Sequence, residues 1–211
     1  MIVSNEDPAA GKVDGATRSI PHGVKRIVLT GFMGAGKTTV GRALAELLGW
    51  EFLDLDQHLE SRTGSTIPDL FKTFGETHFR RLESAALANA LARTNTVLAL
   101  GGGTPEEMAN RLLLEQTPCT VVVFLDAPFP VLFDRCMLEG IGSPELARPV
   151  LTSPAEAEAR FAVRLPLYRR LARITLGTAA LTSIGCAQAL HLELTQLAIG
   201  SARSAGRAAG V

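Results

Sequence analysis

Hydrophobic residues along this chain alternate between short apolar runs and longer stretches with helical spacing. In the longer stretches apolar side chains recur every three or four residues, which is typical of amphipathic helices. The short runs predict five strands, at residues 26–30, 51–54, 96–100, 120–125 and 173–176. Because strands and helices alternate, the pattern predicts an α/β fold, with a parallel five-stranded sheet flanked by helices.

The two ends of the chain lack this periodicity. Residues 1–24 mix glycine, proline, serine and charged residues, and residues 200–211 are mostly small. Both compositions are typical of flexible termini. We therefore expect a flexible N-terminal segment over 1–24, one domain over 25–199 and a flexible C-terminal tail over 200–211.

One internal segment also lacks an apolar period. Residues 139–152 contain two glycines and two prolines, and they predict a long loop, a feature that is usually functional in a compact domain. The next helix is well signalled, with Ser153 as N-cap, Pro154 at its first position and Glu156 completing a capping box. We expect Pro166 to kink or interrupt this helix.

Composition narrows the class of protein. The 211 residues carry 21 basic and 21 acidic side chains, without the basic arm that nucleic-acid binding would favour. The three cysteines are odd in number and widely spaced, which indicates reduced, buried thiols in a cytoplasmic protein. No secretory signal is recognisable, and polar residues within 176–192 favour a C-terminal amphipathic helix over a membrane span.

The strongest local signal is the segment GFMGAGKTT at residues 31–39. It fits the pattern GxxxxGK[ST] between a predicted strand and a predicted helix, as a phosphate-binding loop does. Glycines let several backbone N–H groups turn toward a polyphosphate, the lysine can reach the terminal phosphates, and the hydroxyl after it can coordinate Mg²⁺. The nucleotide-binding residues predicted here are Gly34, Ala35, Gly36, Lys37, Thr38 and Thr39.

Proteins with such a loop include switches, motors and kinases. The sequence has no NKxD motif, which argues against a GTPase of the Ras kind. A motor ATPase would need a magnesium-ordering acid after an apolar strand, and Asp126 superficially supplies one. Because Pro128 follows closely, Asp126 is more typical of a helix start.

Asp54 and Asp56 are stronger candidates, because they lie at the end of the second predicted strand. Strand alternation would point both side chains to one side, and ligands of α/β sheets gather at the carboxyl ends of strands. One acid could order Mg²⁺ through water while the other orients and deprotonates an acceptor hydroxyl. Taken alone, the two acids are equally typical of a solvated helix start.

Several motifs together resemble the shikimate kinase family. The matching segments, in the family's order, are 31–39, FLDLD at 52–56, Phe71 with GE at 75–76, FRRLE at 79–83, GGG at 101–103, RP at 148–149 and RLPLY at 164–168. The resemblance spans about residues 25–175. It implies a single P-loop kinase domain with a lid loop, which phosphorylates shikimate at its 3-hydroxyl with ATP and Mg²⁺ in aromatic amino acid biosynthesis.

The resemblance assigns the acceptor half of the site residue by residue. Arg80 and Arg164 match the positions that bind the shikimate carboxylate, and the Gly102 amide adds a hydrogen bond. Asp56 matches the residue that binds the hydroxyls, including the one that attacks. Guanidinium groups at one end and a carboxylate at the other are what shikimate requires.

The resemblance also assigns the donor half. Thr38 would be a direct ligand of Mg²⁺, and Asp54 would hold the metal through water. Lys37 and Arg148 are predicted to be catalytic. Arg148 matches the family's lid arginine. Arg148 would close over ATP and stabilise charge on the transferring phosphoryl group.

Two other functions stay open at this point. A related kinase for another hydroxylated substrate, such as gluconate, would dispense with the paired arginines. A non-catalytic ligand-sensing module with the same fold could lose Asp56 or Lys37, and this chain retains both. The expected partners are shikimate and ATP, with no nucleic acid and no membrane, and we expect a monomer.

Overall fold

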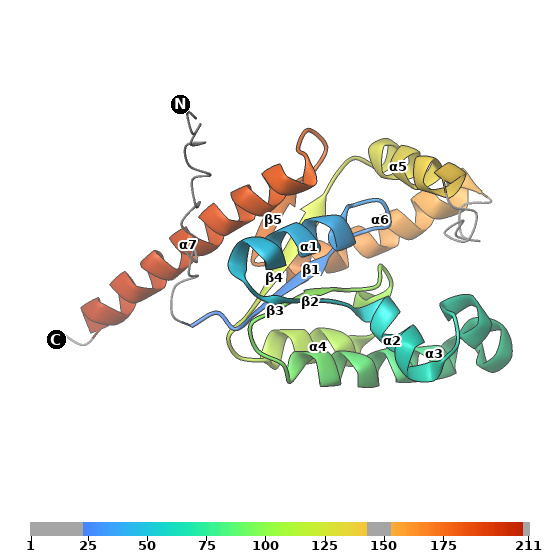
Figure 1. Ribbon diagram of the computed structural model, residues 1–211, viewed down its shortest axis with the longest axis horizontal. Helices are drawn as coiled ribbons and strands as arrows, with labels where there is room; N and C mark the ends of the chain where they lie inside the picture. Colours follow the sequence, from blue (N-terminus) through green and yellow to red (C-terminus); the bar gives the residue numbers. More distant parts are fainter. Residues whose placement is uncertain (1–22, 143–152, 209–211) are drawn as a thin grey trace, which may run out of the picture.

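The computed structural model of the protein describes residues 23–142 and 153–208 (Figure 1). Its elements are, in chain order, β1 (Arg26–Thr30), α1 (Lys37–Leu48), β2 (Glu51–Asp54), α2 (Leu55–Thr63), α3 (Ile67–Leu91), β3 (Thr96–Ala99), the 3₁₀ helix η1 (Thr104–Glu106), α4 (Met108–Gln116), β4 (Thr120–Asp126), α5 (Phe129–Gly142), α6 (Pro154–Leu171), β5 (Ile174–Gly177) and α7 (Ser183–Ala208). The predicted strands match the observed ones to within one residue at either end.

The five strands form one parallel sheet in the order β2-β3-β1-β4-β5. The strand that precedes the phosphate loop is therefore central, with β3 on one side and β4 on the other. All five carboxyl ends lie at one edge, where ligands of such sheets bind. The predicted α/β class and the parallel five-stranded sheet are confirmed.

Two apolar cores cover the two faces of the sheet. Leu29 and Val123 pack on one face with the buried residues of α1 and α7, such as Leu44 and Leu190. The alternate position Val28 packs on the other face, with buried residues of α2, α3 and α4. Successive strand residues point to opposite faces, so the interior positions of the central strands, 27–29 in β1 and 121–125 in β4, are all apolar. Helices cover both faces of the sheet, and the loops at its carboxyl edge lie between these two layers (Figure 1).

Helix α5 differs from the prediction for residues 139–152. It continues to Gly142, so the first part of the expected lid loop is helical. Extending a helix by one residue costs less free energy than starting a new helix. In α5 this advantage outweighs the low helix propensity of the two glycines. The rest of that segment, with Arg148, lies outside the described residues.

The start of α6 follows its sequence signal. The Ser153 hydroxyl accepts a hydrogen bond from the Glu156 amide at 3.3 Å, and Pro154 is the first helical residue. The expected interruption at Pro166 is absent, because α6 runs on to Leu171. Proline costs an interior helix about 3 kcal/mol. Burial of Tyr168 and Leu171 after the proline offsets this cost, at roughly 1.5–3 kcal/mol for each large side chain.

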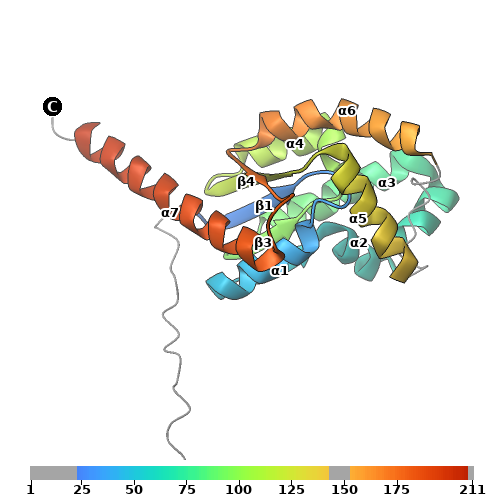
Figure 2. The same ribbon diagram turned by 90° about the horizontal axis from the view of Figure 1, so that it is seen from above.

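The C-terminal amphipathic helix is present as α7, which packs against α1 through Leu190 and Leu194. It continues to Ala208, beyond residue 199 at which we placed the end of the domain, and both views show its end extending away from the sheet (Figure 1, Figure 2). Within residues 23–142 and 153–208, no helix has the length and apolar character needed to cross a membrane. The segment 1–22 lies outside the described residues.

The three cysteines all lie within the described residues, and they form no disulfide. Cys136 and Cys186 are buried, as predicted. Cys119 is exposed, so the prediction of burial is wrong there. It has a φ of 60° immediately before β4, where its backbone carbonyl accepts from the Lys25 amide at 2.8 Å, so the turn and not the core sets its position.

Candidate active site

The phosphate loop lies between the end of β1 and the start of α1. The N-cap of α1 is Gly36, in a left-handed conformation with φ 86°, and it offers no side chain to the first amides of the helix. These amides therefore remain available to an anion, which the helix dipole also favours. The local geometry is that of a polyphosphate cradle.

Gly34 shows why the loop needs glycine. Its φ is 73°, and a Cβ at this position would lie 2.3 Å from the backbone oxygen of Leu132 in α5. Both the left-handed backbone and the close approach of α5 exclude a side chain. Helix α5 is thus packed directly on the phosphate loop.

Arg135 in α5 strengthens this contact and was missed in the sequence. Its guanidinium donates to the Gly34 carbonyl at 3.4 Å and to the Thr178 carbonyl at 2.7 Å. It therefore ties the phosphate loop to the residue that follows β5. Nothing in the sequence distinguishes Arg135 from the other sixteen arginines, because its partners are backbone carbonyls distant along the chain.

The Lys37 ammonium folds back over its own loop. Its Nζ donates to the carbonyl oxygens of Gly31 at 2.9 Å and Phe32 at 3.0 Å. These contacts hold the charge against the start of the loop that leads into the uncapped N-terminus of α1. A lysine is suited to this place because its ammonium is a flexible point charge.

Thr38 and Asp54 come together at the edge of the sheet. The Thr38 hydroxyl donates to Asp54 Oδ2 at 2.7 Å, and Asp54 Oδ1 accepts from the amides of Asp56 at 3.1 Å and Gln57 at 3.3 Å. Asp54 ends β2 and caps α2, so one carboxylate serves the helix start and faces the phosphate loop. Strand alternation does not explain the position of Asp56, because Asp56 already belongs to α2.

The oxygen pair of Thr38 and Asp54 fits Mg²⁺. A hydroxyl and a carboxylate are hard oxygen ligands, and Mg²⁺ usually combines one or two such groups with waters and phosphate oxygens. In the described part of the chain no cluster of three or more His, Cys, Asp or Glu side chains could hold a metal by itself. Any metal here would therefore depend on phosphate oxygens for most of its ligands.

The triple glycine after β3 touches three residues predicted for the acceptor. A Cβ on Gly101 would lie 2.7 Å from Asp56 Oδ1, and one on Gly103 would lie 2.8 Å from Arg80 Nη2. Gly102, between them, has Arg164 Nη1 as its nearest neighbour, at 3.7 Å from such a Cβ. The glycines thus let these three side chains lie against the backbone of one short segment.

Arg80 and Arg164 converge on one oxygen atom. Glu106 Oε2 lies 2.9 Å from Arg164 Nη2 and 3.4 Å from Arg80 Nη2. Each arginine side chain is only 13% exposed. Two guanidinium groups from α3 and α6, distant in sequence, are therefore placed to bind the same carboxylate.

The buried side chain of Glu83 holds the guanidinium of Arg80 in place. This side chain is 2% exposed, and it accepts from Arg80 Nη1 at 2.9 Å and from the Thr104 hydroxyl at 2.5 Å. Burial lowers the pKa of Arg80, but the carboxylates of Glu83, Glu76 and Glu106 together raise the pKa above its ordinary value. Arg80 therefore stays charged, with its orientation set by a buried acid three residues along the same helix.

Tyr168 connects α6 to the triple glycine. Its hydroxyl donates to the Gly102 carbonyl at 2.6 Å, and burial raises the pKa of that hydroxyl, so it remains a donor. This bond holds the helical turn that carries Arg164 against the glycine segment. Arg164 Nε is buried and has no acceptor among the described residues, which leaves one donor for a further oxygen.

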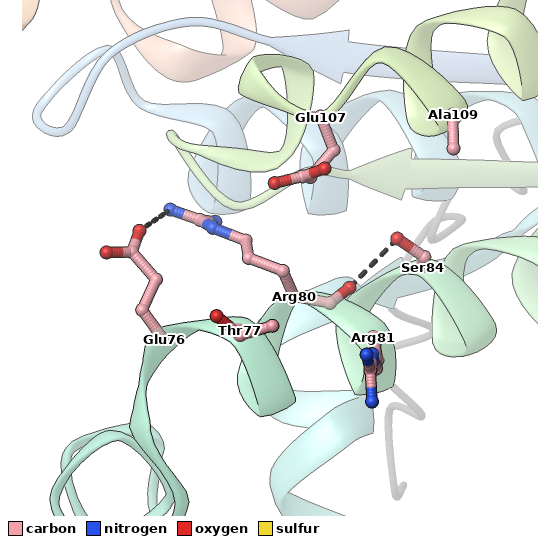
Figure 3. A pocket seen from close by; sticks show the side chains of 7 residues that line it. All are labelled: Glu76, Thr77, Arg80, Arg81, Ser84, Glu107 and Ala109. Carbon is pink, nitrogen blue, oxygen red and sulfur yellow. Dashed lines mark hydrogen bonds and ion pairs between the residues drawn. The ribbon is translucent and has the colours of Figure 1, made fainter.

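An open cavity of about 620 Å³ lies beside Arg80, between α3 and the start of α4 (Figure 3). Figure 3 shows Arg80 reaching from α3 toward Glu76. The cavity is lined by Glu76, Thr77, Arg80, Arg81, Ser84, Glu107 and Ala109. Of the predicted site residues with described positions, Arg80 alone lines it, so the cavity is separate from the phosphate loop.

The chain is similar to known proteins both in sequence and in structure. A family model described as shikimate kinase matches residues 33–195. The shikimate kinase of Symbiobacterium thermophilum is 41% identical over 155 residues, which cover 72% of this chain and 86% of that protein. The residues matched by the family model span the site from Gly34 to Tyr168.

Two solved structures are informative. A shikimate kinase from Acinetobacter baumannii in complex with shikimate superimposes with a TM-score of 0.70, at 38% identity, covering 84% of this chain and 94% of the other. A gluconokinase from Sinorhizobium meliloti 1021 gives a TM-score of 0.55 at 20% identity, covering 88% and 98%. The second similarity is one of fold alone.

Proposed function

Because this chain belongs to the shikimate kinase family, we propose that it transfers the γ-phosphoryl group of ATP to the 3-hydroxyl of shikimate, giving shikimate 3-phosphate and ADP. The observation that carries the proposal is the convergence of Arg80 and Arg164 on one carboxylate oxygen. Shikimate has a carboxylate, and paired guanidinium groups bind such a group with charge-assisted hydrogen bonds.

The donor half binds the ATP phosphates. The backbone amides of residues 34–39 and the Lys37 ammonium would surround the phosphates, and Thr38 and Asp54 would hold Mg²⁺, with Asp54 acting through water. Bound there, Mg²⁺ would neutralise charge on the phosphate oxygens. Two carbonyl oxygens of the loop already hold the Lys37 ammonium beside the segment whose amides would surround the phosphates.

The acceptor half positions the hydroxyl that attacks. Asp56, against the triple glycine, would orient the 3-hydroxyl and accept its proton as the oxygen attacks phosphorus. The Gly102 amide would add a hydrogen bond to the substrate. Because the carboxylate of shikimate is fixed at Arg80 and Arg164, its ring is held in a single orientation, which is the main source of catalysis in phosphoryl transfer.

Arg148 completes the assignment through the family resemblance. It would close over ATP and stabilise charge on the transferring group, with residues around it excluding water. We further propose that the protein acts in the cytoplasm as a monomer, with ATP and shikimate as its partners and no nucleic acid, in keeping with its balanced charge.

The two rival functions are less well supported. Gluconate is an open-chain acid without the ring of shikimate, and similarity to the gluconokinase is limited to fold. A ligand-sensing module would not need the phosphate-loop lysine and Asp56 in place, and both are retained.

The direct test is ADP release by the purified protein. With ATP and Mg²⁺, we expect ADP formation that depends strictly on shikimate, and none above background with gluconate. Detection of shikimate 3-phosphate by mass spectrometry would confirm the product. ADP formation stimulated by gluconate and not by shikimate would select the rival kinase, and binding of shikimate without turnover would select the sensing module.

The arginine pair provides a second test. Arg80→Ala and Arg164→Ala should each raise the KM for shikimate by about tenfold to a hundredfold, because a charge-assisted hydrogen bond contributes roughly 1.5–3 kcal/mol. Arg81→Ala is the matched control, since Arg81 is the exposed neighbour of Arg80 on the same helix. An equal effect of all three substitutions would show that bulk charge and not the pair binds the acceptor.

A further inference from the structure

Glu106 occupies the position that the proposed function gives to the carboxylate of the acceptor. Its Oε2 lies within hydrogen-bond distance of Arg164 Nη2 and 3.4 Å from Arg80 Nη2. We propose that Glu106 is an internal competitor, which holds the two guanidinium groups in the free protein, is displaced by the carboxylate of shikimate, and so sets the affinity for the acceptor. This inference rests on the proposed function.

The charges around Arg80 and Arg164 require that one acid leaves when the substrate carboxylate binds. Three carboxylates, those of Glu76, Glu83 and Glu106, face the two guanidinium groups, which leaves one negative charge in excess. A carboxylate entering beside them would meet like charge in a partly buried place, where such repulsion is poorly screened. One of the three acids must therefore leave as the substrate carboxylate enters.

Exposure and contacts identify the acid that leaves. Glu83 is 2% exposed and held by Thr104, so it cannot move without leaving a buried charge unpaired. Glu76 is 68% exposed and touches Arg80 only from the solvent side. Glu106 is 33% exposed and, among the described residues, is the only acid that pairs with Arg164.

The backbone of Glu106 can stay in place while its side chain rotates. Glu106 is the last residue of η1, and its carbonyl accepts from Arg111 Nη1 at 2.7 Å. The displacement is thus a change of side-chain rotamer, which is rapid for a residue with access to solvent. No strand or helix has to shift.

The arginines remain in position when Glu106 leaves. Arg80 is fixed by Glu83, and its Nη atoms would lie within 2.9 Å of a Cβ on Gly103, so the guanidinium is confined against the backbone. Arg164 lies over the Phe32 ring, 6.0 Å from its centroid. A free carboxylate alone would not displace Glu106. A ligand that also contacts Asp56 and Gly102 through its other groups has the additional binding free energy needed to displace it.

The test compares Glu106→Gln with Glu107→Gln in the full chain. Glu107 is the adjacent acid, is exposed, and forms no ion pair with the described residues, so its substitution removes the same charge without touching the pair. Steady-state kinetics gives KM and kcat for shikimate. Calorimetry gives the Kd of shikimate and of an analogue with a carboxamide in place of the carboxylate.

We expect Glu106→Gln to lower the KM and Kd for shikimate by about threefold to tenfold, because the ion pairs to both Arg80 and Arg164 are lost and a partly exposed pair contributes up to about fivefold. The kcat should stay the same, because Glu106 does not contact the reacting atoms. The Kd of the carboxamide should change much less, since it brings no second negative charge. Glu107→Gln should leave all these values near those of the wild type.

Two outcomes separate the inference from the function on which it rests. If the wild-type protein turns over shikimate but Glu106→Gln leaves the KM unchanged or raises it, Glu106 is not a competitor and instead positions the arginines. If the wild-type protein forms no ADP in response to shikimate, the proposed function fails, and the inference fails with it.

Discussion

At the scale of single residues, the site divides two neighbouring acids between two tasks. Asp54 uses one oxygen for the start of α2 and the other for the Thr38 hydroxyl, so it belongs to the nucleotide side. Asp56, two residues on, lies against Gly101 and so belongs to the acceptor side. The break from strand to helix at Leu55 turns the two carboxylates in different directions.

This division predicts the effect of Asp56→Asn. The substitution keeps the shape of the side chain and removes the base, so kcat should fall by roughly a hundredfold or more, the usual scale for loss of a general base. The KM for ATP should change little, because Asp56 is not on the nucleotide side. Steady-state ADP release measures both quantities.

Asp134→Asn is the control for loss of one negative charge, since Asp134 is exposed on α5. It should retain the activity of the wild type. If Asp56→Asn also retains its turnover, the proton of the acceptor hydroxyl is taken up by another group.

At the scale of elements, the glycine segment after β3 organises the acceptor half. It brings Asp56 of α2, Arg80 of α3 and Arg164 of α6 against one stretch of backbone. Each of these side chains comes from a different helix, and a side chain on the segment would separate them. The three helices can therefore bring their side chains to one place because the segment has no side chains of its own.

Gly101→Ala tests this role. The new methyl group would lie 2.7 Å from Asp56 Oδ1, and the flexible carboxylate is what would give way. Misplacement of a reacting group by about 1 Å can cost up to a hundredfold in rate, so we expect kcat to fall by about tenfold to a hundredfold. The melting temperature should also fall, because the methyl group would lie 3.0 Å from the Thr104 hydroxyl and 3.1 Å from Glu83 Oε1, which are both buried.

The matched control is Gly177→Ala at the end of β5, where an added methyl group has no neighbour within 4 Å. Its kcat should equal that of the wild type. Equal losses in the two variants would mean that the effect comes from backbone stiffness and not from contact with Asp56.

The elements that sequence predicts best are those with strong periodicity. Buried strands such as β1 and β4 are continuous apolar runs, and the phosphate loop has a motif with a physical cause. The capping signal at Ser153 was also sufficient to predict the start of α6. Arg135 and Glu106 could not be predicted, because their roles depend on tertiary contacts and one acid or one arginine has no local signature.

At the scale of the whole molecule, the C-terminal helix supports the nucleotide site indirectly. Helix α7 packs on α1, and α1 begins at Lys37 in the phosphate loop. The same apolar core extends through Leu132 in α5, whose backbone approaches Gly34. The loop therefore rests on a core to which segments from both halves of the chain contribute.

Leu190→Ala and Leu192→Ala measure how much α7 contributes to this core. Leu190 is fully buried in the core with α1, whereas Leu192, two residues away on the same helix, is 59% exposed. Removing a buried leucine side chain costs about 2–5 kcal/mol, because apolar contacts are lost and a cavity remains. We expect Leu190→Ala to lower the free energy of unfolding by this amount and Leu192→Ala by less than about 0.5 kcal/mol. Urea unfolding followed by circular dichroism gives both values, and ATP at saturating concentration should stabilise both variants if the site itself is intact. Equal stabilities would show that α7 contributes little to the core, and its packing on α1 would then be dispensable for the phosphate loop.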